Sequence, residues 1–238
     1  MKILELYSGT QSLSRAARAR GHECTTLDKD SRHSPTICED VLKWNYTTLP
    51  RDAFDFIFCG CPCETYSQAR SKAKISREDA MKAADKIIAR TIHILDYFDA
   101  DFCIENPRFS LLWGRDVARP WAELHISLTS MCRYGFLYRK HTRFASTFPM
   151  RLAPPCGGDC QAMIGKCHQQ WAQKGPGGLT DITHTTDELH RIPESLCDDI
   201  LSAVENVRQA RRSVYQRIDK ASRRSDDVSH VASLPGGD

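Results

Sequence analysis

The sequence lacks any run of about 18 apolar residues, the length that a helix needs to cross a membrane, so no membrane span is expected. No secretory leader is expected either, because MKILELYSGT has one lysine and a short apolar run that leads straight into glycine, and this pattern predicts a first buried strand. No G-x-G-x-x-G fingerprint is present, so a bound pyrophosphate is not specifically indicated. These absences leave a globular chain of 238 residues, enough for one sizeable domain with a small appendage.

The eleven cysteines do not suit a disulfide framework, because their number is odd and several follow one another at spacings of two. Together with the missing leader, this pattern predicts free thiols and a reducing intracellular compartment, the cytoplasm or a nucleus. We expect a monomer with no membrane partner.

Positive charge is concentrated near the end of the chain. The net charge is only +3, but residues 208–224 (RQARRSVYQRIDKASRR) carry seven Lys and Arg residues against one Asp. A basic segment on an otherwise balanced chain indicates a polyanionic partner such as nucleic acid. The other interpretation is the solvated face of a C-terminal helix, and the sequence leaves both open.

Strand-like and helix-like runs alternate over residues 2–107. Such alternation predicts an α/β protein with a Rossmann-like, mostly parallel sheet that is covered by helices on both faces. Ligands of such folds bind at the carboxyl ends of the strands. The expected strands are residues 2–7, 22–30, 52–60 and 101–107, and the expected helices are residues 13–21 and 76–98.

The character of the chain changes near Phe148, where Pro, Gly and Cys become frequent and the periodicity is lost. We therefore divide the chain into four parts. Residues 1–147 form the main domain, and residues 148–188 form a small irregular, Cys-rich subdomain. Residues 189–224 form a C-terminal helix with a basic extension that returns to the core, and residues 225–238 form a disordered tail.

Polar residues follow the expected strands at their carboxyl ends. Ser8 and Gly9 form a turn between the first strand and a helix, where backbone N–H groups are offered to a polar ligand. Asp28 ends the next strand and is placed to accept both hydroxyls of an adenosine ribose, and Asp40 closes a further position of this kind. These features indicate a nucleoside cofactor, while a tight turn at Gly9 and a helix cap at Asp28 are the alternative explanations.

The stretch FCGCPCETYSQAR places Cys63 directly after a Gly-Cys-Pro corner at the end of a strand. Pro62 fixes the backbone and has no N–H, so the corner projects the Cys63 side chain into a cleft. An ordinary thiol is only ~3% ionised at neutral pH, and a nearby basic group raises that fraction. Glu105 ends an apolar strand, where a desolvated carboxyl holds a proton near pH 7 and donates it to a heterocycle. A core cysteine and a salt-bridged glutamate are the alternatives, but the pair indicates a nucleophile beside an acid.

In order and spacing, these residues resemble the DNA cytosine-5 methyltransferases that use S-adenosylmethionine. ELYSGTQS resembles the family's first motif, GCPCETYS its Gly-x-Pro-Cys-Gln-x-Phe-Ser signature, and IENP its Glu-Asn-Val. YGFLYRKHTRF occupies the place of the family's Gln-x-Arg-x-Arg, with Tyr138, Lys140 and Thr142 at those positions. HRIPESLCDDILSA resembles the closing segment, whose helix packs beside the first strand. The resemblance covers residues 2–207.

The resemblance implies the Rossmann-like methyltransferase fold, with residues 1–147 as the catalytic core and residues 148–188 as a reduced target-recognition region. It implies transfer of a methyl group to carbon 5 of cytosine in single-stranded DNA or in double-stranded DNA with a flipped base. The implied catalytic residues are Cys63, which forms a covalent adduct with the base, Glu105, which protonates ring nitrogen 3, and Asn106, Lys140 and Arg143. The implied cofactor contacts are Tyr7, Ser8, Gly9, Thr10, Asp28, Lys29, Asp40, Val41, Gly60 and Pro62. The expected nucleic-acid contacts are Ser67, Arg70, Lys72 and Arg139.

Several positions depart from the family pattern. Gln11 and Ser12 replace the second and third glycines of the first motif, and Thr142 replaces an arginine. Glu64 replaces glutamine, which adds a negative charge that tends to raise the pKa of the neighbouring thiol. Two alternatives therefore stay open: the same chemistry on RNA, and a catalytically silent methyltransferase-like protein that binds nucleic acid or regulates a partner.

The Cys-rich part contains Cys156-x3-Cys160-x6-Cys167-His168, a spacing that resembles a zinc site. This region is too poor in apolar residues for a core, so a metal would supply the missing stability. We predict Cys156, Cys160, Cys167 and His168 as ligands, with His184 in reserve if His168 cannot turn inward. A set of reduced thiols without metal is the alternative.

Overall fold

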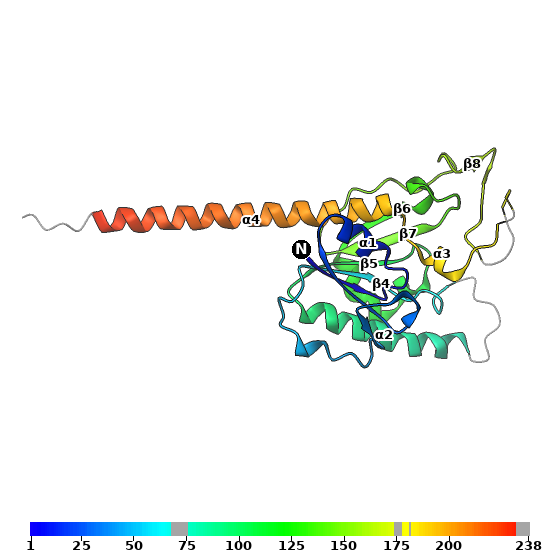
Figure 1. Ribbon diagram of the computed structural model, residues 1–238, viewed down its shortest axis with the longest axis horizontal. Helices are drawn as coiled ribbons and strands as arrows, with labels where there is room; N and C mark the ends of the chain where they lie inside the picture. Colours follow the sequence, from blue (N-terminus) through cyan, green and yellow to red (C-terminus); the bar gives the residue numbers. More distant parts are fainter. Residues whose placement is uncertain (68–75, 174–177, 181, 232–238) are drawn as a thin grey trace, which may run out of the picture.

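The computed structural model describes residues 1–67, 76–173, 178–180 and 182–231, with the side chains of the last helix included as far as residue 218. A seven-stranded sheet with the strand order β3-β2-β1-β4-β5-β7-β6 forms the body of the described chain (Figure 1). The strands are β1 (Lys2–Leu6), β2 (Glu23–Asp28), β3 (Ile37–Cys38), β4 (Phe56–Gly60), β5 (Asp101–Pro107), β6 (His125–Ser130) and β7 (His141–Ser146).

The strands from β3 to β5 are parallel, and β7 lies antiparallel between β5 and β6. The predicted Rossmann-like, mostly parallel sheet is therefore confirmed. The chain proceeds from β1 outward to β3 and then from β4 outward on the other side, so the strand order reverses between β1 and β4. The carboxyl ends of these two strands frame the crevice where such folds bind their ligands. The β6–β7 hairpin is not predicted by the sequence patterns, because the first half of β6 is exposed and its apolar character is weak.

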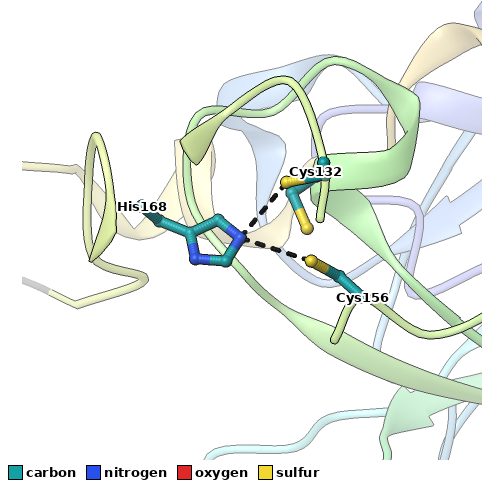
Figure 2. A group of neighbouring side chains, drawn as sticks. Cys132, Cys156 and His168 are labelled. Atoms are coloured by element: carbon teal, nitrogen blue, oxygen red, sulfur yellow. Dashed lines mark hydrogen bonds between the residues drawn. The ribbon is translucent and has the colours of Figure 1, made fainter. Parts of the chain in front are cut away.

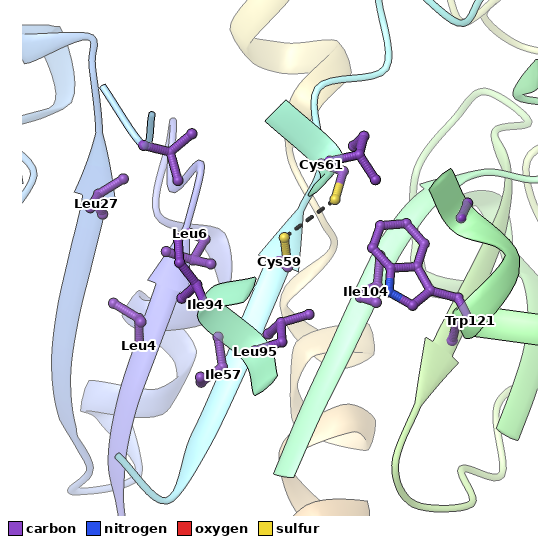
Figure 3. Close-up of a cluster of buried hydrophobic side chains, with 14 of the residues drawn as sticks. Leu4, Leu6, Leu27, Ile57, Cys59, Cys61, Ile94, Leu95, Ile104 and Trp121 are labelled. Carbon is purple, nitrogen blue, oxygen red and sulfur yellow. Dashed lines mark hydrogen bonds between the residues drawn. The ribbon is translucent and has the colours of Figure 1, made fainter. Parts of the chain in front are cut away.

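Successive residues of the central strands face opposite sides of the sheet, and helices cover both sides. Ile3 of β1 packs against α1 (Ser12–Ala19) and the first part of α4 (Glu194–Val231), whereas Leu4 packs against α2 (Arg77–Tyr97). Figure 3 shows Ile94 of α2 beside the leucines of β1, and Leu95 belongs to the same buried cluster. The short 3-10 segments are η1 (Ser31–His33), η2 (Tyr46–Thr48), η3 (Leu111–Gly114), η4 (Asp116–Glu123) and η5 (Met131–Tyr134).

The α2 helix begins where the sequence predicts it. The Ser76 side chain accepts a hydrogen bond from the backbone N–H of Asp79 at 3.1 Å, which satisfies one of the unpaired donors of the first turn. Two acidic residues in that turn, Glu78 and Asp79, interact favourably with the partial positive charge at the start of the helix. Among the described residues, no helix combines the length and the apolar character required to cross a bilayer.

The Cys-rich part, residues 148–188, is an irregular insert. It contains a hairpin of β8 (Met163–Ile164) and β9 (Cys167–His168) and the start of the short helix α3 (Thr186–His190). The backbone N–H of Gln170 donates to the carbonyl of Leu137 at 3.0 Å, so the insert is attached to the connection between β6 and β7. The insert therefore lies beside the end of the sheet that carries the site described below.

The last helix, α4, returns to the core, as the sequence predicts. Its first turns contribute Leu196, Ile200 and Val204 to the core against α1. Figure 1 shows its remaining length projecting beyond the sheet. The helix is described to Val231, whereas we expected the helical part to end at residue 224; residues 232–238 of the expected tail lie outside the described residues.

Candidate active site and metal centre

A cavity of about 410 Å³ opens at the carboxyl ends of β1, β2, β4 and β5. Residues from the strand ends predicted by the sequence meet there, because parallel strands finish at one edge of the sheet. Cys63, Glu105 and Lys140 line it together with every residue predicted to contact the cofactor. The latter are Tyr7, Ser8, Gly9, Thr10, Asp28, Lys29, Asp40, Val41, Gly60 and Pro62.

The turn after β1 has an unusual backbone. Tyr7, Gly9 and Gln11 have φ angles of 56°, 41° and 55°, which lie in the left-handed region that non-glycine residues rarely adopt. Side-chain hydrogen bonds fix the conformation of Gln11. Its Nε2 donates to the carbonyl of His33 at 2.6 Å, and its Oε1 accepts from Arg18 at 3.0 Å. A residue that replaces the family's glycine therefore takes up a glycine-like backbone and is fixed there. Strain of this kind concentrates at binding sites.

Asp28 holds the same turn from the end of β2. Its Oδ2 accepts the backbone N–H of Gly9 at 2.8 Å, and its Oδ1 accepts that of Asp30 at 2.9 Å. A carboxylate has about four acceptor positions, so room remains for ligand hydroxyls. Asp40 lines the cavity further along, and its Oδ1 accepts the N–H of Leu42 at 2.9 Å.

The corner that carries Cys63 is supported from the neighbouring strand. The side-chain amide of Asn106 donates a hydrogen bond to the carbonyl of Cys61 at 2.8 Å, and Asn106 is fully buried. Glu105 and Asn106 are adjacent on β5, so they face opposite sides of the sheet. Glu105 lines the cavity, whereas Asn106 acts on the backbone that leads to Cys63.

Glu105 is a buried carboxyl with one nearby cation. Its Oε1 is buried and has no hydrogen-bond partner among the described residues, and the Nζ of Lys140 lies 4.0 Å away. Burial raises the pKa of Glu105, and the charge of Lys140 opposes that rise. Lys140 is held by the carbonyl of Leu189, to which its Nζ donates at 3.0 Å. This carboxyl is suited to hold a proton and to donate it to a bound molecule.

The pKa of the Cys63 thiol is raised rather than lowered. Burial is the main cause, Lys140 opposes it, and the charges of Glu105 and Glu64 add to it. Glu64 thus raises the pKa of the thiol, as the sequence predicts. Its side chain is 71% exposed and lies 4.0 Å from His190. Burial therefore favours the protonated thiol, and Lys140 is the basic group that favours its thiolate.

Arg143 was predicted as a catalytic residue, but it is not among the residues that line the cavity. Its guanidinium lies over the ring of Trp113, 4.5 Å from the ring centre, and its buried Nε has no hydrogen-bond partner among the described residues. It pairs with Asn106 across β5 and β7, on the face opposite to Glu105. The register between β5 and β7 determines which face of the sheet Arg143 occupies, and the sequence motif alone does not reveal that register.

Two of the four predicted nucleic-acid contacts, Arg70 and Lys72, lie outside the described residues. Ser67 is half-buried, and its carbonyl accepts a hydrogen bond from Arg77 at 2.6 Å. Arg139 is exposed, directly before Lys140.

Sequence reasoning missed several residues at this edge of the site. Phe109 follows β5 with its ring 59% exposed, and the guanidinium of Arg108 lies 5.3 Å from that ring. The α3 helix adds Thr186, Asp187 and His190 to the cavity wall. Its start was detectable, because Thr185 and Glu188 form a capping box with Thr-x-x-Glu spacing.

The structure brings three of the four predicted metal ligands together and replaces the fourth. The ligand atoms of Cys156, Cys160, His168 and Cys132 all lie within 4.8 Å of one another. Figure 2 labels Cys132, Cys156 and His168 of this group. The prediction of Cys167 is corrected: it precedes His168 on β9, so the two side chains point to opposite faces, and Cys167 is exposed.

His184, the reserve ligand, lies elsewhere. Its ring packs against Tyr138 with the ring centres 4.8 Å apart, and its donor atoms are not part of the four-residue cluster. His168 does turn inward, so the condition under which His184 was considered does not arise.

No protein-family model matches the chain. The chain is similar to the probable DNA (cytosine-5)-methyltransferase of Frog virus 3 (isolate Goorha), with 29% identity over 171 residues that cover 66% of this chain and 76% of the viral protein. This similarity supports a methyltransferase. It also confirms the resemblance to the DNA cytosine-5 methyltransferases that the motifs indicated.

Three solved structures are also partly similar in fold. The Entamoeba histolytica methyltransferase EhMeth has a TM-score of 0.49 and 13% identity, with 64% of this chain and 55% of that chain covered. A Spodoptera frugiperda DNMT2 mutant has a TM-score of 0.43 and 15% identity, with coverages of 65% and 54%. The S. pombe Dnmt2 methyltransferase has a TM-score of 0.42 and 11% identity, with coverages of 69% and 57%. The chain thus spans little more than half the length of each.

Proposed function

We propose that this chain transfers a methyl group from S-adenosylmethionine to carbon 5 of cytosine in DNA. One observation carries the proposal: Cys63 and Glu105 line the same cavity as all the residues that the family resemblance assigns to the cofactor. A thiol and a proton-bearing carboxyl at one end of a nucleoside-sized cavity are the two groups that this reaction requires. The similarity to a probable viral cytosine-5 methyltransferase supports the same conclusion.

The cavity fits the cofactor. Its volume of about 410 Å³ lies in the range of about 300–1,000 Å³ that is usual for small-molecule sites. The buried hydroxyl of Ser8 has no hydrogen-bond partner among the described residues, so a polar ligand group would satisfy it. Asp28 would accept the ribose hydroxyls and Asp40 the adenine amino group. When bound, S-adenosylmethionine supplies an electrophilic methyl group on a sulfonium.

Cys63 and Glu105 would activate the base together. Carbon 5 of an intact cytosine ring is a poor nucleophile. Cys63 would therefore first give its proton to a base such as water, and the thiolate sulfur would form a bond to carbon 6 while Glu105 gives its proton to ring nitrogen 3. These two events turn carbon 5 into an enamine carbon that accepts the methyl group. A base such as water would then take the proton from carbon 5, the bond between carbon 6 and the Cys63 sulfur would break with Cys63 leaving as the thiolate, and the proton on nitrogen 3 would return to Glu105.

Lys140 and Asn106 would support these steps. Lys140 lies 4.0 Å from Glu105 and favours the thiolate of Cys63. Asn106 positions the corner through the carbonyl of Cys61. Arg143 lies outside the cavity and over the ring of Trp113, so we propose no direct contact between it and the reacting base.

The base must leave the stack of a duplex before a thiol can reach carbon 6. Exposed Phe109 and the cations Arg108 and Arg139 lie around His141, beyond the end of β5. An exposed aromatic ring among cations is suited to stacked bases and phosphates. In α4, Arg212 and Arg217 are exposed, whereas Arg208 and Arg211 are paired with acids, so only part of the basic segment is available to a polyanion.

The test is mass spectrometry of nucleosides from DNA and from RNA that were incubated with the protein and S-adenosylmethionine. We expect 5-methylcytosine in DNA with the wild type and with Cys38→Ala, which removes an exposed thiol outside the cavity. We expect none with Cys63→Ala and a loss of at least about 100-fold with Glu105→Gln. Modified cytosine in RNA alone would show that the substrate is RNA rather than DNA. Cofactor binding without any modified cytosine would support a catalytically silent nucleic-acid-binding protein instead.

A further inference from the structure

Four side chains from three separate segments meet at the base of the insert, and none of them lines the cavity. The Nε2 of His168 lies 3.6 Å from the sulfur of Cys156 and 3.3 Å from that of Cys160, and Cys132 completes the group. Figure 2 shows one ring nitrogen of His168 turned toward the sulfurs. Around a tetrahedral zinc ion, neighbouring sulfur and nitrogen ligands are about 3.5–3.8 Å apart. The four donors therefore already have nearly the spacing that one ion would impose.

We propose that Cys132, Cys156, Cys160 and His168 bind one structural Zn²⁺. Three thiolates and an imidazole select a borderline-soft, tetrahedral ion over Mg²⁺ or Ca²⁺, which prefer oxygen ligands. All four positions are protein ligands, which is the arrangement of a structural site rather than a catalytic one.

The surroundings of the cluster match those of a thiolate metal site. The backbone N–H of Gly158 donates to the sulfur of Cys156 at 3.3 Å, and Gly158 has a φ of 101° that glycine adopts without strain. Arg133 follows Cys132 and forms an ion pair of 2.5 Å with Asp159, which precedes Cys160. This ion pair connects two ligand-bearing segments, and the guanidinium offsets the net negative charge of three thiolates on a divalent ion.

Among the described residues, the insert has little hydrophobic core at this point. The buried apolar cluster around the four ligands contains only Ala162 besides the cysteines themselves. So small an apolar group stabilises a fold weakly, and small domains of this kind depend on a metal. The ion would replace a hydrophobic core.

Cys132 gives the ion a further role, because it lies on the connection between β6 and β7. Across this connection, the N–H of Met131 donates to the carbonyl of Lys140 at 3.0 Å. The Ser130 hydroxyl accepts the N–H of Cys156 at 2.9 Å and lies 2.7 Å from Nδ1 of His141. The ion therefore attaches the insert to the hairpin that positions Lys140. This second role rests on the proposed function of Lys140, whereas metal binding does not.

Metal content measured on the purified full chain tests the site. We expect about one zinc per chain in the wild type and in Cys167→Ser, the matched control, since Cys167 neighbours His168 but is exposed. We expect less than about a tenth of that in Cys132→Ser. His168→Cys keeps four ligands and is expected to retain the metal, which guards against a general failure to fold. Cobalt titration of the chelator-treated wild type should give the absorption bands of a tetrahedral thiolate site.

Wild-type protein without zinc and without tetrahedral cobalt bands would overturn the proposal. Loss of zinc from Cys167→Ser with retention in Cys132→Ser would overturn the ligand set. The role toward Lys140 is tested by alkylation of Cys63 over a range of pH in the presence and absence of zinc. A profile that moves to higher pH without zinc supports it, and an unchanged profile overturns it while leaving the metal site and the methyl transfer untouched.

Discussion

The side-chain amide of Asn106 donates a hydrogen bond of 2.8 Å to the backbone carbonyl of Cys61, across from β5 to the corner after β4. Both groups are buried, so neither has water as an alternative partner. Pro62 and Cys63 follow this carbonyl directly, and the bond thus fixes the direction in which the nucleophile leaves the strand. The side chain next to Glu105 serves the thiol rather than the acid.

Replacement of Asn106 by alanine is expected to lower methyl transfer at least about tenfold and to lower the free energy of unfolding by about 1–3 kcal/mol, because a buried carbonyl is left unpaired. Urea unfolding and turnover with saturating cofactor measure the two effects. Asn206→Ala, an exposed change in α4, is the control and should change neither. An Asn106→Ala protein with full turnover would contradict the positioning role.

Lys140 is expected to set the reactivity of Cys63. Its charge lowers the pKa of the thiol and of Glu105, so Lys140→Met should raise both. The pH dependence of alkylation of Cys63 by iodoacetamide should move to higher pH, which means slower alkylation at pH 7.5. Lys140→Arg keeps the charge and should restore most of the rate. Identical profiles for methionine and arginine would show that the charge does not act on Cys63.

Glu64 should act in the opposite direction. Its charge raises the pKa of the thiol, so Glu64→Gln, which restores the family residue, should speed alkylation of Cys63 at pH 7.5. The side chain is exposed, so water and salt screen it and the gain should be no more than about threefold. The gain in alkylation rate should also be smaller in about 0.5 M salt, because salt at such a concentration screens surface charges. Slower alkylation of Glu64→Gln would contradict the conclusion that Glu64 raises the pKa of Cys63.

Strand ends and caps were predictable because short-range patterns encode them: the alternation of β1, the Ser76 cap and the corner at Pro62 are each written within a few residues. The proximity of Cys132 to Cys156 was not predictable, because it depends on how the β6–β7 hairpin turns the chain back. The inward position of His168 and the outward position of Cys167 depend on the register of one short strand. The raised pKa of Cys63 follows from burial, which a local motif does not express.

Asp101 is expected to hold α4 on the sheet. Its side chain is buried and accepts from Nη1 of Arg211 at 2.8 Å and from Thr147 at 3.1 Å. Asp101→Ala should lower the free energy of unfolding by about 1.5–3 kcal/mol, because it removes hydrogen bonds to a buried charged group. The control is Asp99→Ala, whose surface pair with Arg51 at 3.6 Å should contribute less than about 1 kcal/mol. Equal effects in thermal unfolding would contradict this difference.

Glu5 should make the stability of the fold depend on pH. It is buried in β1, and its carboxylate accepts the N–H of Ser14 at 2.9 Å. Burial raises its pKa from 4.5 to about 6, against the opposing hydrogen bonds from Ser14 and Leu13. The folded protein thus binds the proton more tightly than the unfolded chain. The resulting stabilisation is complete below the unfolded pKa and is lost as the pH rises through 6.

Glu5→Gln stays neutral and should lack this loss. Relative to the variant, the wild type should therefore lose roughly 1–2 kcal/mol of unfolding free energy between pH 4.5 and pH 7.5, since each unit of pKa difference is worth about 1.4 kcal/mol. Urea unfolding of both proteins at the two pH values measures it, with the exposed Glu23→Gln as the control. A constant difference between wild type and Glu5→Gln would mean that the pKa of Glu5 is the same in the folded and unfolded states. The hydrogen bonds to the start of α1 would then balance the effect of its burial.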